Sequence, residues 1–325
     1  MRALPFAALL LAGCATTSAP LATEAPMVAA TAETDPVDTA ADAADDPAIW
    51  RNPADPSKSL VIGTDKKAGI HVYSLAGKRL SFTPAERLNN VDLRETGARV
   101  IAAASDRADV ATAHVSLFTL DTAAAKLVPL GRFPVGAGEA YGMCLWTRAR
   151  DHALFGFIVL KDGRIDQVAI DLSGATPKVT TVRSIKLATQ SEGCVVDDRT
   201  GQLYVAEEDV GLWRFDADPS APVTATPIAK VDGKTLVADA EGLALAPSGR
   251  AGGYLVASSQ GDNAYTLYRL PGVTYAGRFR IGGGAIDGTS DTDGIDLMLG
   301  DFGPAYPRGL LVAQDGDNAP ATQNF

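Results

Sequence analysis

Residues 60–75 read LVIGTDKKAGIHVYSL and contain two short β-forming runs on either side of a polar turn, Asp65-Lys66-Lys67-Ala68-Gly69. Val, Ile and Tyr favour extended strands, whereas Asp and Gly favour the turn that joins two strands. The stretch therefore predicts a β-hairpin. Its first run, a short apolar stretch that ends in small or polar residues, recurs five more times along the chain, at 99–106, 153–162, 203–209, 254–260 and 310–315.

The spacing of these copies indicates how the hairpins are arranged. Four of the later copies are followed by a second alternating run, at 114–120, 165–170, 212–215 and 265–270. The repeat is roughly 40 to 56 residues long, about the length of a four-stranded propeller blade, and no convincing amphipathic helix interrupts it. We therefore predict an all-β, six-bladed β-propeller that forms a single domain over residues 33–325. The last copy has no second run before Phe325, so we expect either that a strand near residues 33–39 helps to close the ring or that the natural chain is longer.

The N-terminus has the features of an export signal. A positive charge at Arg2 precedes an apolar run over residues 3–12, and Cys14 ends the sequence Leu-Ala-Gly-Cys. This sequence resembles a bacterial lipobox, in which Cys14 carries the lipid, and cleavage as an ordinary secretory signal is the alternative. We predict a signal peptide over residues 1–14 and a disordered tether, rich in Ala, Thr, Ser and Pro, over residues 15–32. The protein is expected to be exported, either lipid-anchored in a bacterial membrane facing the periplasm or exterior, or secreted.

Two cysteines remain inside the predicted domain. In an oxidising compartment Cys144 and Cys194 either pair or remain as two buried thiols, because the sequence does not give the distance between them. Cys144 also begins a Cys-x5-Arg spacing that ends at Arg150, as in thiol phosphatases. That loop has no Gly, so its amides are less free to turn onto a phosphate.

The chain is acidic, and its carboxylates are not spread evenly. The 29 Lys and Arg against 39 Asp and Glu give a formal net charge of −10 at pH 7, which excludes the basic surface that nucleic acids require. Acidic residues gather at the predicted strand ends, and these ends converge on the channel of a propeller. Converging carboxylates repel one another unless hard cations lie among them, so we predict several bound Ca²⁺ ions. The acidic clusters lie at 42–47, 191–193, 207–209, 239–242 and 287–296.

Basic residues accompany these carboxylates at the predicted strand ends. Lys66 and Lys67 follow the first inner strand, Arg107 follows the second, and Lys161 ends the third. A site that holds several cations together with a few basic side chains suits an oxyanion, and phosphate is the commonest oxyanion that needs both.

The chain contains an ordered series of short motifs between about residue 33 and Phe325. They are DDPAIW (45–50), TDKK (64–67), LNNVD (88–92), AAASDR (102–107), EG (192–193), AEED (206–209), ASSQG (257–261), DGTSDTDG (287–294) and VAQDG (312–316). Together these motifs resemble the β-propeller phytases. The resemblance implies a six-bladed propeller, calcium-dependent hydrolysis of phytate (myo-inositol hexakisphosphate), and two phosphate subsites, one for cleavage and one for affinity. The chain departs from the family at its end, where members usually continue into a strand with a Pro-Trp-Glu-type segment.

The resemblance also implies roles for particular residues. Lys66, Arg107 and Lys161 would hold phosphate oxygens, with Lys67 also in the substrate site, and Tyr141 would lie near the cleavage subsite. Asp293 and the loops near it would hold structural calcium. The ligands of the active-site calcium ions would be Glu33, Asp45, Asp46, Glu192, Glu208, Asp239, Glu241 and Asp287.

The resemblance implies a phosphoric monoester hydrolase of the 3-phytase type, and we expect it to act as a monomer on calcium complexes of phytate and other inositol phosphates. A calcium-bound water would attack phosphorus directly, releasing inorganic phosphate and lower inositol phosphates without a covalent enzyme intermediate. A binding module whose calcium only stiffens loops is one alternative, although it would not need Lys66, Arg107 and Lys161 at strand ends. A calcium-dependent esterase or lactonase is another, but it usually has a His or Glu base beside its metal. The histidines, His71, His114 and His152, lie at no suitable strand end.

Overall fold

The predicted hairpin at residues 60–75 is formed by strands β3 (Leu60–Asp65) and β4 (Gly69–Ser74). The two strands pair antiparallel, from Leu60 opposite Ser74 to Asp65 opposite Gly69. Strands β2 (Ala44–Trp50) and β5 (Arg79–Pro84) complete a four-stranded sheet in the order β2-β3-β4-β5. This sheet is the first blade of a β-propeller in a computed structural model that describes residues 24–325.

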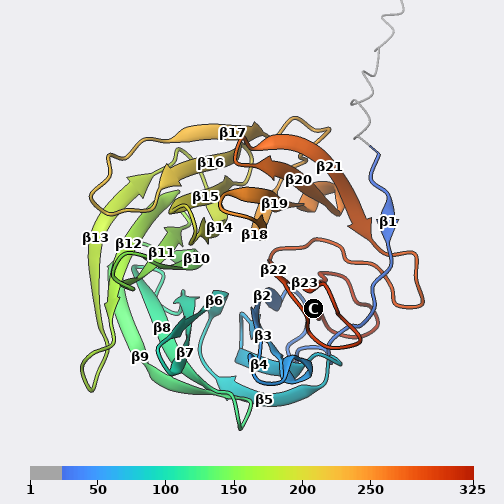
Figure 1. Cartoon of the computed structure of the whole chain (residues 1–325), viewed down its shortest axis with the longest axis horizontal. Helices are drawn as coiled ribbons and strands as arrows, with labels where there is room; N and C mark the ends of the chain where they lie inside the picture. Colours follow the sequence, from blue (N-terminus) through green and yellow to red (C-terminus); the bar gives the residue numbers. More distant parts are fainter. Residues whose placement is uncertain (1–23) are drawn as a thin grey trace, which may run out of the picture.

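Four further sheets repeat this arrangement around the ring (Figure 1). Each is an antiparallel meander whose first strand is innermost. The second blade contains β6 (Leu88–Thr96), β7 (Arg99–Asp106), β8 (Thr112–Asp121) and β9 (Lys126–Ala137). The third contains β10 (Ala140–Thr147), β11 (Leu154–Leu160), β12 (Arg164–Asp171) and β13 (Lys178–Lys186). The fourth contains β14 (Ser191–Asp197), β15 (Gln202–Glu207), β16 (Gly211–Asp216) and β17 (Thr226–Lys230). The fifth contains β18 (Ala240–Ser248), β19 (Gly252–Ser259), β20 (Ala264–Leu270) and β21 (Thr274–Ile281).

The number of complete blades differs from the prediction of six. The structure has five four-stranded blades, and the last repeat forms a two-stranded sheet of β22 (Ile295–Leu299) and β23 (Gly309–Ala313). Strand β22 contacts β18 on one side and β2 on the other, so the two-stranded sheet completes the ring of inner strands. Because no second run follows residues 310–315, the outer pair of strands is not formed in the part of the chain described. The only helical elements among residues 24–325 are the short 3-10 turns η1 (Pro56–Lys58) and η2 (Gln260–Asp262).

The segment near residues 33–39 lies where the ring closes. This agrees with the predicted alternative in which that segment helps to close the ring. Its backbone N–H groups donate from Thr34 to Phe325 O and from Val37 to Gln323 O, each at 2.9 Å, and from Asp35 to Gly77 O at 2.7 Å. The segment is not a regular strand, but these bonds join the N-terminal side of the domain to its C-terminal residues and to the first blade.

The predicted tether is ordered in part. Strand β1 (Met27–Val28) pairs parallel with β21 at Arg280 and Ile281, so the fifth sheet gains an edge strand. The predicted signal peptide with Cys14, and the first part of the tether, lie outside the described residues. Within residues 24–325, no helix has the length and hydrophobicity that crossing a membrane requires.

The hydrophobic core is divided among the spaces between neighbouring sheets. Buried apolar residues of the first and second blades, such as Ile62 and Leu120, form one cluster, and residues of the third and fourth blades, such as Phe157 and Val205, form another. Each sheet buries both faces in this way, because each lies between two neighbours in the ring. The inner strands are thereby held at a fixed spacing around the channel.

Candidate active site

Five inner strands carry an irregularity at the same place. The pairing of each inner strand with its neighbour shifts between residues 44 and 47, 88 and 91, 140 and 143, 191 and 194, and 240 and 243. A bulge removes residues from the regular ladder and turns their side chains in new directions. The residues affected are Asp45 and Asp46, Asn89 and Asn90, Tyr141 and Gly142, Glu192 and Gly193, and Glu241 and Gly242. The repeated bulge therefore places polar side chains from successive blades around the channel.

Glycine at the second bulged position lets neighbouring blades approach closely. A Cβ atom on Gly142 would overlap the backbone carbonyl of Glu192 in the next blade. The backbone N–H of Gly242 donates to Asp293 O at 2.8 Å, which joins the fifth blade to the segment before β22. A larger residue at these positions would push the inner strands apart, and the carboxylates would separate with them.

Three glutamates meet at this end of the channel. Glu192 and Glu241 come from the bulges of β14 and β18, Glu208 follows β15, and one carboxylate oxygen from each lies within 4.8 Å of the others. All three side chains are buried. Burial raises the pKa of Glu192 and of Glu241 well above the ordinary value, and nearby carboxylates raise both further. Burial also raises the pKa of Glu208 to about 6. We call Glu192, Glu208 and Glu241 the glutamate cluster. Ionisation of its carboxylates is unfavourable without a metal, and a bound cation would remove that free-energy cost.

The oxygens of this region fit a calcium ion. Asp45 Oδ2, Glu208 Oε1 and Glu241 Oε2 are buried and have no hydrogen-bond partner among the described residues. Unpaired buried acceptors are unfavourable, and a metal ion is one of the partners that can satisfy them. Calcium prefers several carboxylate and carbonyl oxygens in a flexible geometry. This donor set contains oxygen and neither imidazole nor thiolate, so it matches calcium better than zinc.

Lys66 lies among a second set of carboxylates, next to the glutamate cluster. Its Nζ is 2.6 Å from Asp42 Oδ1, 3.0 Å from Asp45 Oδ1 and 2.9 Å from Asp293 Oδ2. The resemblance assigned Asp293 to structural calcium together with the loops near it. In the structure Asp293 lies beside Lys66 and Asp45, and burial raises its pKa to about 7, with Asp45 adding to the effect. Its carboxylate is therefore one of the charged groups around Lys66.

Arg107 and Lys161 both lie close to one aromatic ring, that of Tyr141. The guanidinium carbon of Arg107 is 5.2 Å from the ring centre of Tyr141, and Nζ of Lys161 is 5.0 Å from it. Cations at this distance are attracted by the aromatic face. Burial raises the pKa of Tyr141, and the charges of Glu192 and Glu241 raise it further, so its phenol stays protonated. The ring of Tyr141 thus contacts both Arg107 and Lys161 beside the glutamate cluster.

A cavity of about 690 Å³ opens above these groups. Its polar lining includes Lys66, Tyr141, Glu208, Asp239 and Glu241, and the segment at residues 316–323 forms another part of its wall. Burial raises the pKa of Asp239, and Asp209 nearby contributes. The cavity is large enough for a small, highly charged molecule, and its wall carries both carboxylates and a lysine.

Four other residues predicted for the site are not members of the glutamate cluster: three are exposed, and Asp46 is buried close enough to the cluster that, after burial itself, the charges of Asp45 and Glu192 raise its pKa. Glu33 is exposed, and its Oε2 accepts a 3.3 Å bond from Asn324 Nδ2. Asp287 is exposed and lies near Asp315, whose pKa is raised to about 6 by burial, with a smaller effect from Asp287. Lys67 is exposed and its Nζ donates to Ala40 O. Asp46 is buried, but its Oδ2 accepts from Val91 N at 2.9 Å in the next blade.

Polar residues without a predicted role support the site. Asn89 Nδ2 donates to Glu192 Oε1 at 2.7 Å, Gln190 Nε2 donates to Glu208 Oε2 at 2.8 Å, and Gln260 Nε2 donates to Asp293 Oδ1 at 2.7 Å. Glu139 Oε1 accepts from Arg107 Nε at 2.8 Å. A sequence signal could have located three of the five bulges, because 141–142, 192–193 and 241–242 each place Gly after a polar residue near the start of an inner strand, and 293–294 repeat this pattern just before β22.

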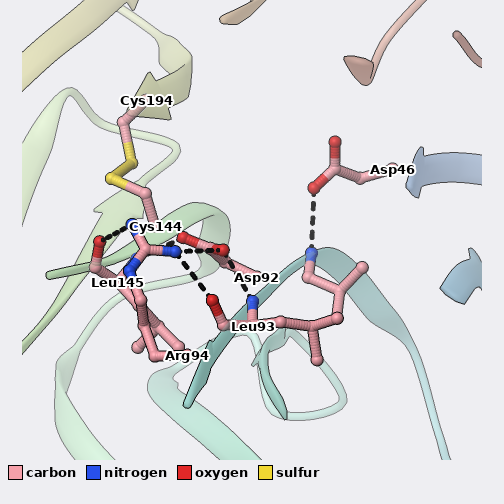
Figure 2. Close-up of a disulfide and its surroundings, with 8 residues drawn as sticks. Asp46, Asp92, Leu93, Arg94, Cys144, Leu145 and Cys194 are labelled. Carbon is pink, nitrogen blue, oxygen red and sulfur yellow. Dashed lines mark hydrogen bonds and ion pairs between the residues drawn. A yellow bond between two sulfur atoms is a disulfide. The ribbon is translucent and has the colours of Figure 1, made fainter. Parts of the chain in front are cut away.

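A disulfide lies farther along the channel, between the third and fourth blades. Cys144 on β10 and Cys194 on β14 are bonded, with a Cα–Cα distance of 5.7 Å, which settles the alternative that the sequence left open. Figure 2 shows it beside Asp92 and Arg94, whose side chains contact Leu145. The disulfide lines a second cavity of about 310 Å³. Because Cys144 is bonded, the Cys-x5-Arg spacing does not supply a free nucleophilic thiol here.

Comparisons with known proteins agree with this geometry. A family model described as Phytase matches residues 3–325. The 3-phytase of Bacillus subtilis (strain 168) is 42% identical over 317 residues, which cover 92% of this chain and 82% of that protein.

Solved structures resemble the chain in fold alone. A chain of the Kuenenia stuttgartiensis hydrazine synthase has a TM-score of 0.52 at 11% identity, covering 77% of this chain and 76% of that one. A chain of the mitotic checkpoint complex has a TM-score of 0.52 at 12% identity, covering 100% and 88%. The similarity to the Bacillus 3-phytase is of a different order, since 42% of the residues are identical over 92% of this chain, and the Phytase family model matches nearly the whole sequence. The chain therefore belongs to the phytase family of enzymes.

Proposed function

We propose that this enzyme hydrolyses phosphomonoesters of phytate in a calcium-dependent reaction at the channel mouth. The observation that carries the proposal is the glutamate cluster, in which Glu192, Glu208 and Glu241 place carboxylate oxygens within 4.8 Å of one another. Basic side chains that suit phosphate surround this cluster. The similarity to a protein named 3-phytase supports phytate as the substrate class.

The negative charges of phytate and of the cavity explain why the proposed reaction requires calcium. Phytate is a polyanion, so a cavity lined by unneutralised carboxylates would repel it. The glutamate cluster, with Asp45, Asp239 and Asp293 near it, would hold several calcium ions and so reverse the local sign of charge. When bound, calcium supplies positive charge to the phosphoryl oxygens and lowers the pKa of a coordinated water.

The basic residues have separate tasks in this scheme. Lys66 and Arg107 bind phosphate oxygens, and Lys161 adds a third positive charge beside Tyr141. In the transition state, charge grows on the transferred phosphoryl oxygens, and fixed donors that already point at them stabilise it. The neutral phenol of Tyr141 keeps Arg107 and Lys161 in place without adding negative charge. No side chain is required to form a covalent intermediate.

An assay of purified protein with phytate tests this function. We expect release of inorganic phosphate and lower inositol phosphates when calcium is present, loss of release with a chelator, and recovery when calcium is returned. Lys161→Ala should lower the rate by about ten- to a thousandfold, as for removal of one transition-state donor. Lys178→Ala, a lysine at the exposed start of β13, is the matched control. Turnover that persists in chelator would show that the chemistry does not depend on calcium.

We also propose, for the whole molecule, that the two-stranded sheet is the inner half of a sixth blade. It occupies the position between the fifth and first blades that a sixth blade would fill.

The sequence around Cys14 supports export and lipid attachment at that cysteine, and we propose that the enzyme acts as a monomer.

A further inference from the structure

Asn89 connects a phosphate-binding side chain to a carboxylate of the glutamate cluster. Its Oδ1 accepts a 2.8 Å hydrogen bond from Arg107 Nη1, and its Nδ2 donates a 2.7 Å hydrogen bond to Glu192 Oε1. Arg107 follows β7 in the second blade, whereas Glu192 belongs to β14 in the fourth. Asn89 is itself in the bulge of β6 and is fully buried. One amide therefore bridges two groups that come from different blades.

The chemistry of the two partners determines why this residue is an asparagine. A guanidinium can only donate hydrogen bonds, and an ionised carboxylate can only accept them. The amide meets both needs, because it carries an acceptor oxygen and a donor nitrogen on the same short side chain. An aspartate at this position could accept from Arg107 but would face Glu192 with a second negative charge. A leucine of similar size could contact neither partner through a hydrogen bond.

Glu139 holds the other side of the same guanidinium. Its Oε1 accepts from Arg107 Nε at 2.8 Å and from Nη2 at 2.5 Å. An arginine has five N–H donors, and among the described residues Asn89 and Glu139 engage three of them, one each on Nε, Nη1 and Nη2. One N–H therefore remains on each terminal nitrogen, and such a pair can hold two oxygens of one phosphate. Asn89 and Glu139 together fix where that pair points.

We propose that Asn89 is a positioning residue that sets the phosphate-binding Arg107 and the calcium-binding Glu192 in one relative geometry. The proposal rests on the proposed function. Without Asn89, Arg107 keeps Glu139 but loses its second anchor, and Glu192 loses a donor that orients its carboxylate. Partners of metal ligands commonly change metal affinity by about 10- to 100-fold when removed. Loss of Asn89 therefore affects both phosphate binding and calcium binding, through Arg107 and Glu192 respectively.

A double-mutant cycle separates this role from a general effect on folding. The four proteins are the wild type, Asn89→Leu, Arg107→Ala and the double variant, each assayed for kcat/KM with phytate at fixed calcium. We expect Asn89→Leu to lower kcat/KM by about 10- to 100-fold in the wild type and several-fold less in the Arg107→Ala background. Calorimetric titration of calcium without substrate is the second readout. Asn89→Leu should weaken calcium binding by about tenfold, and by more than Arg107→Ala, which leaves the hydrogen bond from Asn89 to Glu192 available.

Matched variants control for the loss of a buried hydrogen bond. Thr83→Val removes a bond of 3.0 Å between Thr83 Oγ1 and Leu127 O, between the first two blades and outside the site, and should change neither readout. Thermal melting checks that each variant folds, and Asn89→Ala replaces Asn89→Leu if the larger side chain prevents folding. Additive losses in the cycle, or an unchanged calcium affinity in the Asn89 variant, would each overturn the proposal. If wild-type turnover proves independent of calcium, the proposed function fails instead, and titrations with calcium and with inorganic phosphate still report on Asn89.

Discussion

Lys66 Nζ lies 2.9 Å from Asp293 Oδ2, an ion pair between residues 227 positions apart that joins the first blade to the segment before β22. Burial opposes the charge of Lys66, but the carboxylates of Asp45 and Asp293 raise its pKa, so it remains a cation. One ammonium group therefore neutralises carboxylates at the closure of the ring, and in the proposed function it also offers positive charge to a phosphate.

Lys66→Met keeps most of the side-chain volume and removes this charge. We expect it to lower phytate hydrolysis and the melting temperature of the calcium-free protein, because removing one partner of a buried ion pair typically costs about 3–5 kcal/mol. Lys58→Met removes an exposed pair with Asp55 and should cost less than about 1 kcal/mol. Melting curves in chelator compare the two variants with the wild type. Equal melting temperatures for all three would contradict a stabilising role for Lys66.

Glu241 and Asp287 were both predicted to bind calcium, but the structure places them in different surroundings. We expect Glu241→Gln to reduce the calcium-dependent rise in melting temperature and the activity together, because it removes one charge from the glutamate cluster. A site at a hundred times its dissociation constant contributes about 2.7 kcal/mol of stability. Asp287→Asn, at an exposed position, should retain most of the activity. A larger loss of activity in Asp287→Asn than in Glu241→Gln would show that Asp287 is the more important ligand.

The sequence was sufficient to predict the all-β propeller class, though not the number of complete blades, and to predict several of the side chains that meet in the candidate site, for identifiable reasons. The hairpin at 60–75 and its copies are local patterns, so the blades could be read from them. Lys66, Arg107, Lys161 and the three glutamates were found because charged residues at strand ends are conspicuous in a sequence.

Other features depended on distances that the chain sets only after it folds. The pairing of Cys144 with Cys194 needs two blades to meet, and the place of Asp293 beside Lys66 depends on closure of the ring. Asn89 was overlooked because a neutral amide has no charge to mark it, and its importance comes from its two partners. The strand at Met27–Val28 was missed since its small, mixed neighbours resemble a tether.

The pH dependence of the calcium-free protein should reveal buried carboxylates at the second cavity. Burial raises the pKa of Asp296 to about 7, and Asp92 contributes, whereas an unfolded aspartate titrates near about 3.9. Between these values the folded state binds more protons than the unfolded state, so stability falls as pH rises from about 4 to 7 and stays lower above that range. In Asp296→Asn the fall should be shallower, whatever its stability at pH 4. Denaturant unfolding in chelator at several pH values measures the slope, and parallel slopes in the two proteins would contradict the assignment.

The disulfide is expected to stabilise the propeller without taking part in hydrolysis. Its cysteines are 50 residues apart, and a loop of that size corresponds to roughly 4 kcal/mol in the chain-entropy description. A variant with serine at both Cys144 and Cys194 should therefore unfold at lower denaturant concentration. Its kcat/KM with phytate should stay close to that of the wild type at temperatures where it is folded. A large loss of kcat/KM in fully folded variant protein would show that the link between the third and fourth blades also shapes the site.

The position of bound calcium is the most direct test of whether the glutamate cluster is the metal centre of this phytase. Crystals grown with calcium, measured with X-rays at a wavelength where calcium scatters anomalously, locate each ion independently of any assumed ligand. We predict an ion within about 2.3–2.6 Å of carboxylate oxygens from Glu192, Glu208 and Glu241, and loss of that ion in Glu241→Gln crystals. Calcium found only at surface loops, in crystals of an enzyme whose phytate hydrolysis still needs calcium, would contradict the assignment of the site to these three glutamates.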